Sequence, residues 1–260
     1  MHCLEELAHK YPQLTLPIKE GMKNTEEYRN ICLKGVPSPY KLDFTFNNKD
    51  SLETINTKVG DIEVLSLRDR NDFIHAVRAL GNKCEKVEVP DSTGAIFISG
   101  LNNWEKVRAN LENYKDSIII LSSGNYSNVS NKDVYDVTSG EINLTKEEWT
   151  DKSIIIRKYH ELTHFIMRKL HPEDIKPIRD ELIADITGLI GAFGYFDERL
   201  LKLFLGIESN TYRKGGRLEN YEGGEEKNIP QVIKQIEDLK NRFSVYKNVE
   251  EIYNNIERFM

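Results

Sequence analysis

The feature that most constrains this chain is the segment at residues 154–167, which reads Ile-Ile-Ile-Arg-Lys-Tyr-His-Glu-Leu-Thr-His-Phe-Ile-Met. Apolar residues recur here at i, i+4, i+7, i+11 and i+15, namely Ile155, Tyr159, Leu162, Ile166 and Leu170. This periodicity predicts a helix that crosses the core. Because four residues turn a helix by about 400°, His160 and His164 would lie one turn apart on one face.

The pattern His160-Glu161-x-x-His164 predicts metal chemistry on that helix. Two imidazole nitrogens one turn apart can bind one tetrahedral Zn²⁺. Glu161 beside them can accept a proton from a metal-bound water. The alternative is that both histidines are core residues with ordinary hydrogen-bond partners, because buried histidines need a partner of some kind.

A second acidic segment favours the metal. Asp180-Glu181-Leu182-Ile183-Ala184-Asp185 continues a helical pattern, and Glu181 follows His164 by 181 − 164 = 17 residues, enough for a loop and an antiparallel helix. Glu181 and Asp185 share one face, beside apolar residues, where paired carboxylates need a cation. We therefore predict Glu181 as the third metal ligand and Asp185 as the acceptor for the free N–H of a ligating histidine. Three protein ligands leave a fourth position for water, as in catalytic zinc sites.

With these two motifs, the sequence resembles the gluzincin branch of the zincin metallopeptidases, of which thermolysin is a member. The resemblance covers residues 150–195, and its spacing of 17 residues between motifs is shorter than gluzincins commonly show. The metzincin branch would need Gly and His where this chain has Met167 and Leu170. His171 lies one position too late, before Pro172, and is expected to be a loop residue, with a ligand role as the alternative.

Composition limits the other classes of function. The 260 residues are 39% hydrophobic and 30% charged, with a net charge of 36 − 42 = −6 and no basic block, so nucleic-acid binding is not expected. No apolar run approaches the ~18 residues of a membrane helix. The N-terminus resembles no signal peptide, and no pro-segment is recognisable. The three cysteines Cys3, Cys32 and Cys84 form neither a metal motif nor a disulfide framework. These features predict a cytoplasmic protein.

Local patterns predict the remaining elements. We expect strands at residues 42–46, 62–67, 86–89, 94–99 and 116–121, and helices at 1–11, 72–80, 102–114, 145–170, 178–193, 197–205, 230–243 and 248–259. Thr145-x-x-Glu148 is a capping box that would begin the metal helix. Residues 94–121 read as a βαβ-like unit, but they lack the glycine patterns of nucleotide-binding loops.

Two loops are candidates for contact with substrate. By the zincin resemblance, residues 122–143 could supply an edge strand that pairs with an extended peptide, whereas the residues alone favour a surface hairpin. The glycine-rich segment 206–229 contains Tyr212, Arg213, Arg217 and Tyr221, each able to stabilise an oxyanion or to be a solvated loop residue.

The sequence thus predicts one α+β, zincin-like catalytic unit: an N-terminal part, 1–143, that carries the sheet, and a helical part, 144–260, that carries the metal site. The expected function is a zinc-dependent hydrolase, a metallopeptidase with Glu161 as general base, acting on peptide or protein substrates. The alternatives are a zincin-like metal-binding regulatory or interaction module without hydrolytic activity, and an interaction protein without metal. The sequence does not indicate the substrate, the cleavage specificity or the oligomeric state.

Overall fold

The computed structural model describes residues 2–173, 177–209, 211–221 and 228–259. The chain divides into two compact units, Met1–Ser123 and Gly124–Met260, and each is described by itself. The first combines a sheet with helices and the second is mainly helical, so the predicted α+β class is confirmed. None of the described helices has the length and apolar character needed to cross a membrane.

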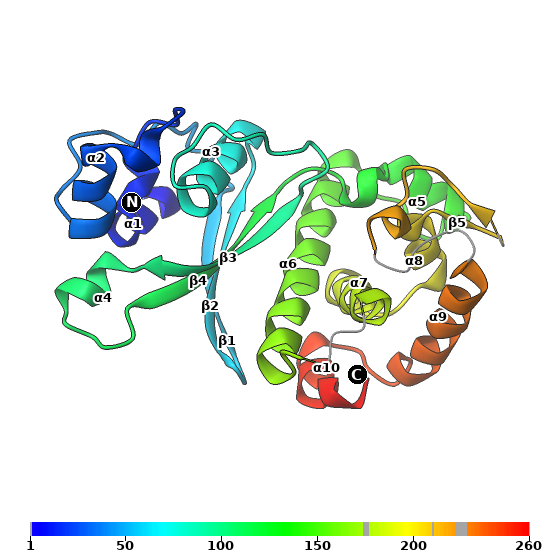
Figure 1. The fold of residues 1–260 in the computed structure, drawn as a ribbon. Coiled ribbons are helices and arrows are strands. Elements are labelled where there is room, and N and C mark those ends of the chain that lie inside the picture. Colours follow the sequence, from blue (N-terminus) through cyan, green and yellow to red (C-terminus); the bar gives the residue numbers. More distant parts are fainter. Residues whose placement is uncertain (1, 174–176, 210, 222–227, 260) are drawn as a thin grey trace. The chain divides into compact units, whose positions relative to one another are not determined.

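The first unit is built on a four-stranded sheet in the order β1-β2-β4-β3 (Figure 1). Alternate residues of β2 and β4, such as Leu65 and Ile120, share a buried core with Leu7 of α1 and Phe73 of α3. In this unit, with η denoting 3-10 or π turns, the elements are α1 (Cys3–Lys10), η1 (Pro12–Thr15), η2 (Met22–Asn24), α2 (Glu26–Tyr28), η3 (Arg29–Leu33), β1 (Ser51–Thr57), β2 (Gly60–Leu67), α3 (Arg70–Gly81), β3 (Ala95–Asn102), α4 (Trp104–Arg108) and β4 (Lys115–Ser122).

The predicted βαβ-like unit is wrong, because β3 and β4 are antiparallel neighbours. The parallel pair in the sheet is β2 with β4. The helix between β3 and β4 has only five residues, and Leu111 and Tyr114, which the pattern placed on its buried face, are 52% and 40% exposed. The connection is therefore a wide hairpin, closed by a hydrogen bond from Asn103 N to Tyr114 O, rather than a helical crossover.

Two predicted strands are also wrong, because their backbone groups find other partners. In residues 42–46, Thr45 N donates to the Asp72 carboxylate at 3.0 Å, and Phe46 has a φ of +57°, outside the extended region. In residues 86–89, Arg78 Nε donates a hydrogen bond to the carbonyl oxygen of Val87 at 2.8 Å. Leu42, Phe44 and Val89 pack against the core, whereas Phe46 and Val87 are exposed.

The second unit (Figure 1) is a helical assembly around α6 and α7, which pack against each other. Its elements are η4 (Tyr126–Asn128), α5 (Asn131–Val137), α6 (Lys146–Leu170), α7 (Pro177–Phe193), α8 (Glu198–Leu205), β5 (Ile207–Glu208), β6 (Thr211–Tyr212), η5 (Arg217–Asn220), α9 (Ile229–Phe243), α10 (Val249–Asn255) and η7 (Ile256–Arg258). The sequence-based boundary lies at residue 143, whereas residues 124–143 belong to this unit, where η4 contacts α6 and α8 and α5 contacts α8. The expected edge strand or hairpin at 122–143 is wrong, because beyond β4 this segment forms η4 and α5.

Helix α6 begins where the capping box predicts. Thr145 N donates to Glu148 Oε2 at 2.8 Å, and Glu148 N donates to Thr145 Oγ1 at 3.2 Å. This reciprocal pair satisfies two of the free N–H groups at the helix start. The helix then runs for 25 residues to Leu170, so the histidine pair lies well inside a regular helix.

Two glycines let α7 approach α6 closely. A Cβ added at Gly188 would lie 2.7 Å from the Ile156 carbonyl oxygen, and one added at Gly191 would lie 2.1 Å from the Tyr159 ring. Neither position leaves room for a side chain, so the helix separation depends on both glycines.

We predict that Gly188→Ala lowers the free energy of unfolding by about 1–3 kcal/mol, because overpacking against helix backbone outweighs alanine's better helix propensity of about 1 kcal/mol. Urea unfolding with a metal chelator present would measure it. Lys169→Ala, at an exposed position of α6, is the control and should change stability by less than about 0.5 kcal/mol. A Gly188→Ala protein as stable as the natural one would show that the helices separate at little cost.

Candidate metal centre

The two histidines of α6 face each other in a buried position. His160 and His164 are one helical turn apart, as predicted, and both are buried. Their Nε2 atoms lie 3.1 Å apart. Two ring nitrogens this close can form one edge of a metal site.

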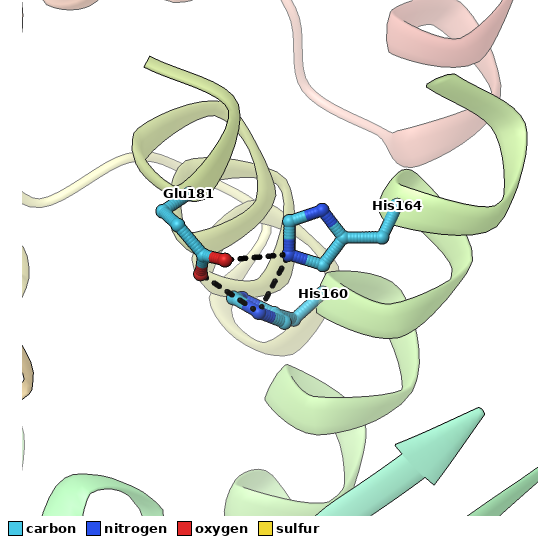
Figure 2. A group of neighbouring side chains, drawn as sticks. All are labelled: His160, His164 and Glu181. Atoms are coloured by element: carbon cyan, nitrogen blue, oxygen red, sulfur yellow. Dashed lines mark hydrogen bonds and ion pairs between the residues drawn. The ribbon is translucent and has the colours of Figure 1, made fainter. Parts of the chain in front are cut away.

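Helix α7 brings Glu181 to the same point. Its Oε2 lies 3.4 Å from His160 Nε2, and its Oε1 lies 3.3 Å from His164 Nε2. Figure 2 shows the two rings extending from α6 toward this carboxylate. Among the described residues, these three side chains form the group whose potential ligand atoms all lie within 4.8 Å of one another. The structure therefore brings together the three predicted ligands, and they could hold a metal ion.

Asp185 lies one turn further along α7 and is fully buried. Its Oδ1 is 2.8 Å from His160 Nδ1, the partner predicted from the sequence. Because an ionised carboxylate only accepts hydrogen bonds, Nδ1 carries the proton, and the lone pair of the neutral ring lies on Nε2, which faces Glu181 and His164. Asp185 thus selects the ring tautomer that can bind a metal.

Three further side chains surround Asp185. Tyr126 of η4 donates its hydroxyl to Oδ1 at 2.6 Å, Tyr221 donates to Oδ2 at 3.1 Å, and Arg217 of η5 lies 3.2 Å from Oδ1. The Arg217 guanidinium also reaches the ligand group, with Nη2 at 3.4 Å from His160 Nε2 and 3.7 Å from Glu181 Oε2. These donors give a buried carboxylate the hydrogen bonds that it needs.

Of the four loop candidates, the structure brings two to the site. Arg217 and Tyr221 contact Asp185, whereas Tyr212 donates to Gly216 O and Arg213 donates to Leu203 O. Residues 222–227 of the predicted loop lie outside the described residues. Tyr126 was not predicted, because a tyrosine in a Ser/Asn/Gly-rich segment carries no local signal of a contact with α7.

Glu161 and His171 lie outside the ligand group. Glu161 is half-buried, and its negative charge acts on the neighbouring His160. His171 follows the last residue of α6, where its N–H donates to Met167 O at 2.8 Å, and it is not part of the group of potential ligands. Asp174, in the turn predicted after it, lies outside the described residues.

The titration of these groups follows from their contacts. Burial alone would lower the pKa of His160, but the hydrogen bonds to Asp185 and Glu181 outweigh it and raise the pKa well above its usual value. Burial would raise the pKa of Glu181, but the two histidines outweigh it and lower the pKa well below its usual value. Burial raises the pKa of Asp185, and hydrogen bonds from His160 and Tyr221 oppose that rise. Without metal, a proton on His160 Nε2 therefore occupies the place that a metal would take.

We predict that metal binding releases about one proton from His160, so that affinity weakens about tenfold for each pH unit below the raised pKa of this histidine. The sign follows from the raised pKa: at neutral pH the ring is protonated without metal, and raising the pH removes the competing proton. Calorimetric titration with Co²⁺ or Zn²⁺, in buffers of different ionisation enthalpy, would count the protons.

The control for this prediction is Asp185→Asn, which removes the carboxylate that raises the pKa of His160. Its metal affinity should be weaker and should depend less on pH near neutrality. Equal affinity of the natural protein at about pH 6 and pH 8 would contradict a protonated His160.

Comparison with known proteins identifies a family. Residues 2–112 and 106–258 match the family described as "Family of unknown function (DUF7005)". These stretches span nearly the whole sequence, so the chain belongs to this family. No curated protein matches the chain, and no solved structure does.

Proposed function

We propose that this chain is a zinc-dependent hydrolase, a metallopeptidase, with His160, His164 and Glu181 as zinc ligands and Glu161 as general base. The observation that carries the proposal is the geometry of the ligand group. Zinc–ligand distances of about 2.0–2.2 Å in a tetrahedron give ligand–ligand distances of about 3.3–3.6 Å. The two Nε2 atoms lie 3.1 Å apart, and each lies 3.3–3.4 Å from one of the two oxygens of Glu181, so both nitrogens and the carboxylate could reach one zinc ion.

The choice of ligands supports zinc over harder cations. Two imidazole nitrogens and one carboxylate suit zinc, whereas calcium and magnesium take sites made of oxygen atoms. Three protein ligands are also the number found in catalytic zinc sites, which keep one position for water or substrate. Asp185 on His160 supplies the carboxylate–histidine–metal arrangement that orients such ligands.

Glu161 would move the proton in the reaction. A zinc ion bound here would supply a water whose pKa is lowered to near 7 and would polarise the substrate carbonyl. Glu161 follows His160 directly in α6 and is half-buried. Its carboxylate would accept a proton as water attacks the peptide carbonyl and would then donate it to the leaving amine.

Arg217 is the best placed donor for the developing negative charge. Its Nη2 lies 3.4 Å from His160 Nε2 and 3.7 Å from Glu181 Oε2, and guanidinium groups only donate hydrogen bonds. A fixed cation beside the ligand group would stabilise the oxyanion of a tetrahedral intermediate. Tyr221 directs its hydroxyl to Asp185 instead, so we assign the oxyanion role to Arg217.

One observation favours the alternative, a zincin-like metal-binding module without hydrolytic activity. The Arg217 guanidinium contacts both Asp185 and Tyr126, so it is held close to the ligand group. In this position it would limit the space for a substrate beside the metal. A hydrolysis assay separates the two functions, because a binding module would hold metal and a partner without cleaving it.

We predict one equivalent of zinc per chain in protein purified without chelator, measured by elemental analysis. His164→Ala should lose the metal, because two remaining ligands bind zinc weakly. His171→Ala is the matched control, a histidine seven residues further along the chain that should keep the metal content unchanged. Less than about a tenth of an equivalent in the natural protein, even after zinc is supplied, would exclude the proposed site.

We predict that Glu161→Gln retains zinc and folds normally but loses turnover by about 10²–10⁴-fold, because glutamine keeps the shape of the side chain and cannot accept the proton. The natural protein is first screened against unstructured proteins and peptide libraries, with a chelator-treated sample beside it. The matched control is Glu147→Gln, an exposed glutamate in the first turn of the same helix, which should cleave at the natural rate.

Two results would contradict this mechanism. If Glu161→Gln cleaves as fast as the natural protein while chelator stops both, Glu161 is not the general base. If the natural protein holds zinc and captures a peptide or protein that it never cleaves, the binding module is the better description.

A further inference from the structure

Tyr126 occupies a position in the metal centre that its hydrogen bonds fully determine. The side chain is 3% exposed. Its hydroxyl oxygen lies 2.6 Å from Asp185 Oδ1 and 3.3 Å from His160 Nδ1. Arg217 donates to this hydroxyl from the other side. Because guanidinium is only a donor and the phenol has one proton, the Tyr126 proton must point to Asp185.

The helix that carries the metal ligands also fixes Tyr126. Ser153 of α6 accepts the backbone N–H of Tyr126 at 3.0 Å, and Arg157 donates to the carbonyls of Gly124 and Asn125 just before it. Ser153, Arg157 and His160 are related by i, i+4 and i+7, so they share one face of the helix. The backbone and the hydroxyl of Tyr126 are thus placed relative to His160 by a single rigid element.

The aromatic ring of Tyr126 is also held in place by its neighbours. Phe204 of α8 packs edge-on against it at 5.1 Å between ring centroids, and the Arg217 guanidinium lies over its face at 4.6 Å. Such cation–π contacts add to the hydrogen bond from the same guanidinium. Tyr126 therefore cannot move away from Asp185 without losing its contacts with Phe204 and Arg217.

From this arrangement we propose that Tyr126 is a positioning residue of the metal centre, which acts on the metal through Asp185. The hydroxyl and His160 Nδ1 meet at the same carboxylate oxygen, Oδ1. A carboxylate fixed by a rigid donor holds the imidazole plane, and with it the direction of the His160 Nε2 lone pair. The proposal rests on the metal site of the proposed function, but not on the hydrolytic reaction.

A purely structural role would give a different result. Tyr253 provides the comparison, because its hydroxyl bonds to the same helix, donating to Tyr159 O at 3.2 Å, away from the ligand group. Removing either hydroxyl should cost some stability, since each satisfies a buried or half-buried polar group. Only the Tyr126 hydroxyl should influence metal binding.

The experiment compares Tyr126→Phe with Tyr253→Phe in the full chain. Zn²⁺ affinity is measured by chelator competition, and the absorption spectrum of the Co²⁺-loaded protein reports ligand geometry. Tyr126→Phe should weaken Zn²⁺ binding about tenfold and alter the Co²⁺ bands, whereas Tyr253→Phe should leave both unchanged. Equal affinities for Tyr126→Phe and the natural protein would overturn the proposal.

A double-mutant cycle tests the route through Asp185. In an Asp185→Ala background, Tyr126→Phe should have no further effect on affinity, because the acceptor through which it acts is gone. A second tenfold loss in that background would overturn the route. If Tyr126→Phe fails to fold, Ser153→Ala replaces it: this variant loosens Tyr126 without altering the hydroxyl, and it should weaken binding in the same direction.

The test of the role of Tyr126 can be distinguished from the test of the proposed function. A natural protein that binds no metal would overturn both. A protein that binds Zn²⁺ and shows the difference between the two tyrosines, yet cleaves no peptide, would support the role of Tyr126 and contradict the peptidase.

Discussion

The hydrogen bond between His160 and Asp185 is the contact on which the second unit depends. It joins α6 to α7 at 2.8 Å, and Asp185 has no exposed surface. An unpaired carboxylate at such a position would destabilise the fold by several kcal/mol, so the chain must surround it with donors. Those donors come from η4, α6 and the segment after β6, through Tyr126, His160, Arg217 and Tyr221. One buried charge on α7 thereby holds three other parts of the chain around the ligand group.

The two helices also lie close together on either side of this contact. Gly188 follows Asp185 by three residues, and it meets Ile156, four residues before His160, where no Cβ would fit. Gly191 does the same against Tyr159, one turn further along α7. The small residues therefore lie on the face of α7 that carries Asp185, and they set the distance across which its hydrogen bond forms. Packing of the helices and geometry of the metal centre are consequently one property of this pair of helices.

The parts of the structure that local sequence determines were predictable. The capping box at Thr145 and the spacing of His160 and His164 depend on residues within one or two turns, so the helix and the orientation of its ligands follow from sequence alone. Sheet topology depends on partners far apart in the chain, and the short helix after Trp104 gave no sign that β3 and β4 are antiparallel. Tyr126 was missed for the same reason, because the contact that defines it spans 59 residues of sequence.

Metal binding would change the balance of charges at the ligand group. Without metal, the contacts balance: Glu181 and Asp185 contribute −2, while Arg217 and protonated His160 contribute +2. Binding a divalent ion exchanges one proton for two positive charges, so these four groups with the ion would change from 0 to −1 + 2 = +1. The negative charge of Glu161, which also acts on His160, would stand beside them. Because His160, His164 and Asp185 are buried, this change of charge would act strongly on neighbouring groups, since electrostatic interactions strengthen as the local dielectric falls. The proton on His160 thus stabilises the metal-free fold, and under the proposed function its replacement by a metal would supply positive charge for an oxyanion.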